Sequence, residues 1–60
     1  MFVVEKKESA KTKKSYVCLA YVVGNKKFIV TFDKIVIMKI LNWTFEDIES
    51  MAIGEVVEVK

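Results

Sequence analysis

The side chains that most often carry enzyme chemistry are scarce in this 60-residue chain, which has one cysteine and no histidine. Cys18 therefore has no imidazole to activate it as a nucleophile, and a serine would lack the same base. One cysteine cannot form a disulfide within the chain, and the common zinc sites need histidine or more cysteines. Because Cys18 lies in the most apolar stretch of the sequence, we expect a packed, unreactive thiol.

Carboxylates and glycines give no catalytic pattern either. Glu46, Asp47 and Glu49 are expected on the solvent-exposed side of a short helix, where they complement the positive end of its dipole. Acid–base catalysis needs two carboxylates in different environments. Gly24 and Gly54 are too far apart for a phosphate-binding loop. The composition thus predicts a protein that is not an enzyme, with no metal, no cofactor and no small-molecule substrate.

Lysines are concentrated in the first half of the chain. Residues 1–27 carry seven lysines and two acidic residues, a net charge of +5, whereas residues 28–60 carry three lysines and six acidic residues, a net charge of −3. Lysines and aromatic rings on strands are typical of proteins that bind single-stranded nucleic acid without sequence preference. The residues predicted to bind nucleic acid are Lys6, Lys7, Lys11, Lys13, Lys14, Lys26, Lys27, Tyr16 and Tyr21. Alternatively, the lysines protect strand edges from aggregation and the rings belong to the core.

Three strands are expected to hold these residues. Residues 2–7 form the first and are followed by a polar loop. Residues 15–23 are apolar at both alternating sets of positions, which is typical of a strand covered on both faces. Gly24 and Asn25 then predict a tight hairpin turn with a positive φ at its first central residue. In the third strand, residues 26–32, alternation assigns one face to Phe28, Val30 and Phe32 and the other to Ile29 and Thr31.

The second half is expected to contain two helices and a last strand. Residues 34–41 are rich in β-branched side chains, which favour a strand. Three capping signals favour a helix instead: Asp33 as its N-cap, Asn42 as the left-handed residue after it, and the capping-box spacing of Thr44 and Asp47. We therefore predict a helix over 34–41 and a second over 45–51. The buried stripe of the second is predicted to hold Phe45, Ile48, Met51 and Ala52, and residues 55–59 are predicted to form an edge strand.

The order β-β-β-α-α-β predicts a single α+β domain over residues 1–60, in which a small antiparallel sheet packs against a helical corner. The alternative is an all-β, SH3-like small barrel. Residues 40–51, ILNWTFEDIESM, locally resemble the turn and second helix of helix-turn-helix proteins. In that family the start of the second helix meets DNA base edges. Here that start carries three acids and no lysine or arginine, so we reject a DNA-reading helix.

Apolar residues make up 53% of the chain, more than so small a domain can bury, which predicts a homo-oligomer or a protein partner. The alternative function is therefore a protein–protein interaction module: a regulator, an inhibitor or a small subunit of a complex. Its predicted partner-binding residues are Trp43, Glu46, Asp47 and Glu49, although Trp43 also suits a staple that fixes the second helix to the core. The sequence has no apparent signal peptide or membrane span, so we expect a cytoplasmic protein with no membrane contact.

Overall fold

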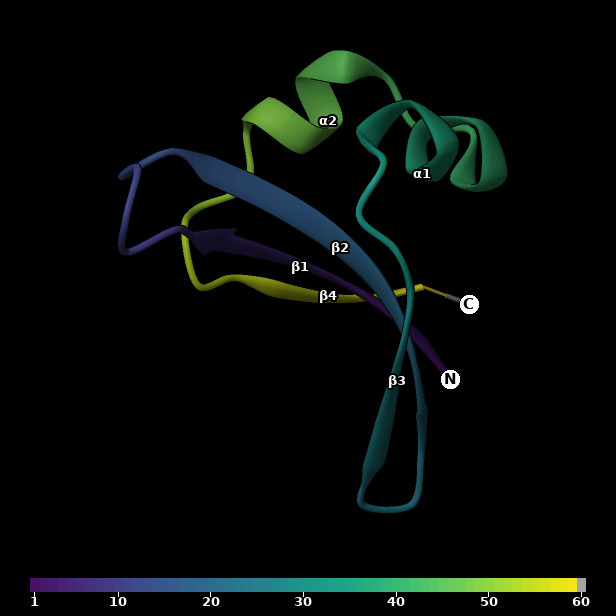
Figure 1. Ribbon diagram of the computed structural model, residues 1–60. Helices are drawn as coiled ribbons and strands as arrows, with labels where there is room; N and C mark the ends of the chain where they lie inside the picture. The colour runs from purple at the N-terminus through teal and green to yellow at the C-terminus, as the bar shows by residue number, and fades with distance from the viewer. Residues whose placement is uncertain (60) are drawn as a thin grey trace.

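Four antiparallel strands and two short helices make up residues 1–59, the part of the chain that the computed structural model describes (Figure 1). The elements are β1 (Phe2–Glu8), β2 (Ser15–Val23), β3 (Lys26–Thr31), α1 (Lys34–Leu41), α2 (Phe45–Glu49) and β4 (Val56–Val59). Their order in the sheet is β3-β2-β1-β4. The predicted α+β class and element order are confirmed. The sheet is open, with β3 and β4 as its edges, so the SH3-like barrel is wrong.

The β2–β3 hairpin turns at Gly24, whose φ of 60° confirms the predicted positive value at the first turn position. Beyond the turn the pairing follows a regular register as far as Ala20 opposite Ile29, but the next pair is Leu19 opposite Thr31. The residue left over is Val30, and this bulge reverses the side-chain alternation after it. Phe28 and Phe32 therefore lie on opposite faces of the sheet, and the prediction that they share one face is wrong.

Capping residues determine where the two helices, α1 and α2, begin and end. The Asp33 carboxylate accepts hydrogen bonds from the backbone N–H groups of Ile35, at 2.9 Å, and Val36, at 3.4 Å. Asn42 follows α1 in the left-handed conformation with φ of 57°. At α2 the capping box is complete: the Thr44 side chain accepts from the Asp47 N–H at 3.2 Å, and Asp47 accepts from the Thr44 N–H at 2.8 Å. The helix predicted over 34–41 is therefore confirmed against its strand alternative.

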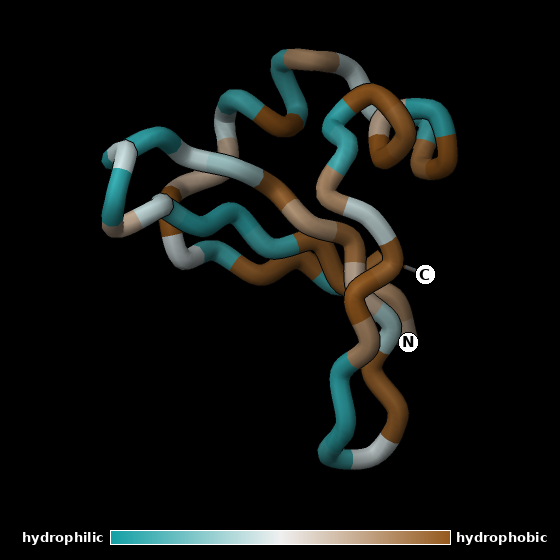
Figure 2. The backbone as a smooth tube through the Cα atoms, in the orientation of Figure 1, coloured by the Kyte–Doolittle hydropathy of each residue, from teal (hydrophilic) through white to brown (hydrophobic). Residues whose placement is uncertain are grey.

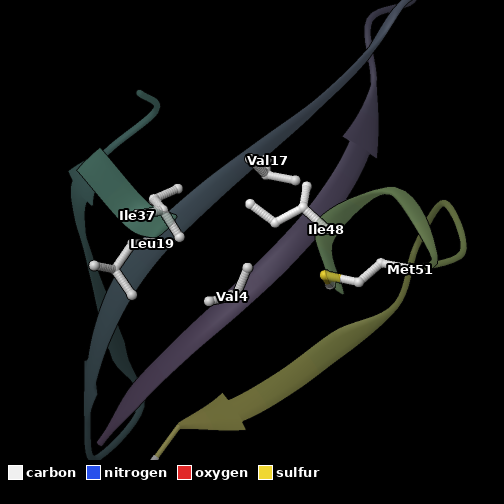
Figure 3. Close-up of a cluster of buried hydrophobic side chains, with 6 residues drawn as sticks. All are labelled: Val4, Val17, Leu19, Ile37, Ile48 and Met51. Atoms are coloured by element: carbon white, nitrogen blue, oxygen red, sulfur yellow. The ribbon is translucent and has the colours of Figure 1, made fainter. Parts of the chain in front are cut away.

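The hydrophobic core lies between one face of the sheet and the two helices, which carry the chain from the β3 edge to the β4 edge. Its buried side chains are Val4, Val17, Leu19, Ile37, Ile48 and Met51 (Figure 3). Trp43 is partly buried and packs against this cluster. No helix in residues 1–59 is long and apolar enough to span a membrane.

Helix α2 is shorter than predicted, ending at Glu49 rather than at residue 51, and only part of its expected stripe is buried. Ile48 and Met51 are in the core, whereas Phe45 is 54% exposed and Ala52 is also exposed. The ring of Phe45 instead lies 4.8 Å from the ammonium group of Lys34, on the outside of the corner. The prediction that Phe45 and Ala52 are buried is wrong: Phe45 turns outward to Lys34, and Ala52 lies beyond the end of α2, where helical spacing no longer applies.

Candidate nucleic-acid interface

The two faces of the sheet are covered in different ways. Alternation along β1 directs Val4 and Lys6 toward the helices, and it directs Glu5 and Lys7 to the opposite side. We call that opposite side the open face, because no helix in residues 1–59 packs on it. The register between neighbouring strands shows which residues line the open face. They are Val3, Glu5, Lys7, Tyr16, Cys18, Ala20, Val22, Lys27, Ile29, Val56 and Glu58.

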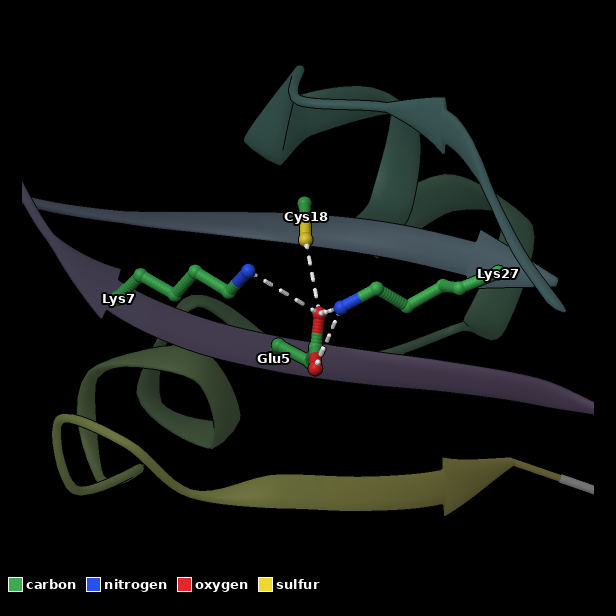
Figure 4. A network of polar contacts seen from close by, with 4 residues as sticks. All are labelled: Glu5, Lys7, Cys18 and Lys27. Carbon is green, nitrogen blue, oxygen red and sulfur yellow. Dashed lines mark hydrogen bonds and ion pairs between the residues drawn. The ribbon is translucent and has the colours of Figure 1, made fainter. Parts of the chain in front are cut away.

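A polar network lies on the open face, over Cys18 (Figure 4). The ammonium group of Lys27 donates to both carboxylate oxygens of Glu5, at 3.0 and 3.2 Å, and the ammonium of Lys7 lies 3.7 Å from the same carboxylate. The Cys18 thiol donates to Glu5 at 3.5 Å. Cys18 is only 1% exposed although no helix or second sheet among residues 1–59 covers this face. Long charged side chains therefore take the place of a covering helix here, with their aliphatic stems over a small residue.

The network fixes the charge states of its members. The hydrogen bond from Lys27 holds the pKa of Glu5 below its usual value, although burial opposes this effect. The same bond raises the pKa of Lys27. Burial, and then the hydrogen bond to Glu5, raise the pKa of Cys18, so its thiol form is favoured. Burial and a raised pKa both agree with the unreactive thiol that the sequence predicts.

Two aromatic rings project from the open face. Tyr16, 39% exposed, lies opposite Lys7 in the β1–β2 register. Phe32, 58% exposed, follows β3, and its ring centroid is 6.0 Å from that of Tyr16. Sequence analysis did not name Phe32 as a site residue, and strict alternation placed it on the face of Phe28. The bulge at Val30 moves it beside Tyr16, and only the pairing of β3 with β2 reveals that bulge.

The other exposed lysines of the predicted nucleic-acid-binding set lie at the two ends of β2. Lys11, Lys13 and Lys14 are in the turn between β1 and β2, and Lys26 and Lys27 begin β3 at the other end, where alternation places Lys27 on the open face and Lys26 on the opposite one. Nine residues of extended strand separate the two turns, which is about 26 Å. The open face, with its rings and with Lys7 and Lys27, therefore extends between two basic turns.

Three of the predicted nucleic-acid-binding residues, Lys6, Tyr21 and Lys26, lie on the other side of the sheet, the last because its side chain alternates with that of Lys27. Lys6 is 8% exposed, and its ammonium group donates to the backbone oxygens of Ile48, at 3.2 Å, and Glu49, at 3.3 Å. It thereby adds a hydrogen bond to two carbonyls at the end of α2, of which that of Ile48 also accepts from the Met51 N–H at 3.1 Å. Tyr21 packs edge-on against Phe2 on the helix side, with ring centroids 4.9 Å apart. None of these three side chains joins the group on the open face.

The residues predicted to bind a protein partner lie on the helical corner. Trp43 packs against the core, as the staple interpretation expects, and Asp47 is engaged in the capping box. Glu49 forms an ion pair with Lys34 at 3.2 Å. Glu46 is exposed on α2. Intramolecular contacts therefore account for three of these four side chains.

Residues 1–59 form no detectable pocket and hold no group of three potential metal ligands. Comparison of the chain with protein-family models, with curated proteins and with solved structures finds no match.

Proposed function

We propose that this protein binds single-stranded nucleic acid along its open face, without strong sequence preference. The observation that carries the proposal is the exposed pair of rings, Tyr16 and Phe32, on a sheet face between two lysine-bearing turns. Bases stack on aromatic side chains whatever their identity, while lysines attract the phosphates. A single strand extended along the open face beside β2 would meet Lys11, Lys13 and Lys14 first, then the rings, and then Lys27.

Lysine supplies this surface with charge but not with base selectivity. All ten basic residues of the chain are lysines, and an ammonium group lacks the two-pronged geometry with which arginine recognises guanine. Glu5 holds the ammonium groups of Lys7 and Lys27 above the open face and offsets part of their charge. The uncompensated charge is therefore concentrated in the turns. This pattern favours attraction to the phosphate backbone over recognition of particular bases.

The alternative, a module that docks on a partner protein through Trp43 and the acidic α2, has weaker support. Trp43, Asp47 and Glu49 already have intramolecular roles, which leaves Glu46 as the side chain available to such a partner.

The proposal is tested by titrating a fluorescently labelled oligothymidylate of about 16 nucleotides, the upper end of known single-strand site sizes. We expect binding at micromolar protein in low salt, and an affinity that falls as salt rises because bound counterions are released. Replacing Lys11, Lys13 and Lys14 with Glu should abolish binding. Replacing them with Gln should reduce the slope of log affinity against log salt by about 2. Lys39→Glu, an exposed charge reversal on α1, should change the affinity less than Lys13→Glu does.

Two tyrosines provide a matched test of stacking. Tyr16 and Tyr21 are on the same strand and each is 39% exposed, but they lie on opposite faces. Stacking on one base is worth about 1 to 3 kcal/mol, so Tyr16→Leu should weaken binding by about tenfold and Tyr21→Leu should leave it nearly unchanged. Absence of binding by the unaltered protein, or equal losses in the two variants, would refute the proposal.

A further inference from the structure

Strand β3 is the most exposed strand of the sheet. Phe28, Ile29 and Val30 leave 55%, 44% and 49% of their surfaces accessible, whereas the neighbouring β2 buries its central residues, 17–20. One edge of β3 pairs with β2, and the other faces no strand in residues 1–59. Figure 2 shows hydrophobic segments on both strands of this hairpin where it projects away from the helices. An apolar edge strand with unpaired backbone groups is a template for pairing with another chain.

The total exposed area points to a partner for this surface. The accessible surface is 4501 Å², whereas a folded monomer of 6.9 kDa exposes about 4,000 Å². The excess is about 500 Å² per chain. Two copies that buried this excess against each other would hide about 1,000 Å², which is the lower limit for a specific protein interface.

The hairpin register shows which backbone groups of β3 are free to pair. Val23 and Lys26 flank a two-residue turn, and such a pair exchanges hydrogen bonds within the hairpin. Hydrogen-bonded and non-hydrogen-bonded pairs then alternate, so Lys26 and Phe28 bond to β2 while Lys27 and Ile29 direct their N–H and C=O groups outward. The bulge at Val30 ends this regular stretch. Any added strand must therefore bond to Lys27 and Ile29.

We propose that two copies of this chain pair through β3 in an antiparallel dimer, with the two-fold axis passing Phe28. In this register Lys27 of each copy exchanges backbone hydrogen bonds with Ile29 of the other, so all four outward residues are satisfied. Phe28 meets the second copy's Phe28 as a non-hydrogen-bonded pair, the arrangement that brings side chains closest. The exposed apolar surface of β3 thereby becomes the centre of the interface.

Neighbouring registers fit less well. A shift that centres the axis on Lys27 places two lysines directly opposite each other, which is destabilising. A shift that centres it on Ile29 requires Thr31 to pair outward across the bulge. In the proposed register the two Lys26 side chains are offset by four residues, about 13 Å along the strands, so salt screens their repulsion. Lys27 is held by Glu5 of its own copy.

The dimer joins two four-stranded sheets into one of eight strands. Because Lys27 and Ile29 point to the same side of the sheet, the two open faces form one continuous surface. The dimer does not depend on nucleic-acid binding: it is measured in the absence of nucleic acid, and failure of either proposal leaves the other standing.

Sedimentation equilibrium tests the dimer directly. We expect a mass approaching twice 6.9 kDa as the concentration rises from micromolar to millimolar. Phe28→Lys places two ammonium groups at the axis and should raise the dissociation constant by roughly thirtyfold or more. Ile53→Lys is the matched control, because Ile53 is 56% exposed, close to the 55% of Phe28, but lies in the connection from α2 to β4. A monomer mass throughout, or equal dissociation by the two variants, overturns the proposal.

Oxidative cross-linking tests the register without destabilising the fold. Opposed residues in a non-hydrogen-bonded pair have Cα atoms about 4.5 Å apart, within the range that a disulfide spans. Phe28→Cys should therefore form a covalent dimer on mild oxidation, whereas Ile53→Cys should do so far more slowly. The buried Cys18 does not compete. Equal cross-linking rates in the two variants would contradict an axis at Phe28.

Discussion

The two faces of this sheet are built from the same four strands but are covered differently. On the helix side, Leu19 and Val4 pack against Ile37 and Ile48 with almost no exposed surface. On the open face the buried residues are small, such as Cys18 and Ala20, and charged side chains cover them. The first arrangement stabilises the fold through apolar area. The second leaves rings and ammonium groups accessible, so we assign stability to one face and binding to the other.

The largest expected effect is the loss of stability when a core side chain on the helix side is truncated. Ile37 is fully buried, whereas Ile35 on the same helix is 62% exposed. Ile37→Ala should lower the free energy of unfolding by about 3 kcal/mol, and Ile35→Ala should change it by less than about 0.5 kcal/mol. Urea unfolding followed by circular dichroism measures both. Similar losses in the two variants would show that the helices do not divide a buried face from an exposed one.

The next largest effect is a difference in stability between variants of two adjacent lysines that lie on opposite faces of the sheet. Lys6 donates to two carbonyls at the end of α2, and Lys7 forms a longer ion pair on the open face. Lys6→Met should cost about 2 kcal/mol, as expected for lost hydrogen bonds from a charged group. Lys7→Met should cost at most about 0.5 kcal/mol but should weaken oligonucleotide binding. If Lys6→Met weakened binding with no loss of stability, the two roles would be the reverse of those assigned.

The smallest effect is the pH dependence of the open-face network. The pKa of Glu5 is lower in the folded protein than in the unfolded chain, so the ionised carboxylate stabilises the fold above the ordinary glutamate pKa of about 4.3. This stabilisation should fade as the pH falls through the folded-state pKa. Glu5→Gln should therefore reduce the loss of stability between neutral pH and about pH 3. Glu46→Gln, on the exposed side of α2, controls for the removal of one negative charge.

Much of the fold could be predicted because the decisive signals are local. Asp33, Asn42 and Thr44 fix the ends of the helices through hydrogen bonds to residues two to four positions away, and they outweigh the strand preference of the β-branched residues in α1. Gly24 likewise determines the hairpin turn within four residues. Because both partners of each of these contacts lie within a few residues of each other, the sequence alone is enough to predict them.

The candidate site was harder to predict because it depends on contacts between distant segments. Val3 and Val4 are equally apolar, so the sequence cannot say which faces the helices, and therefore whether Lys6 or Lys7 is buried. The bulge that brings Phe32 beside Tyr16 arises from the pairing of β3 with β2. The open face is recognised only once the helices are known to cover the other side.

The most direct test of the division between the two faces is a titration of the isotopically labelled protein with oligothymidylate, followed by amide chemical shifts. We predict that the shifts change along β1 and β2, in the turn that carries Lys11, Lys13 and Lys14, and near Phe32. Amides in α1 and α2 should move little, since the sheet separates them from the open face. Changes centred on the helices, with the open face unaffected, would contradict the assignment of binding to the open face.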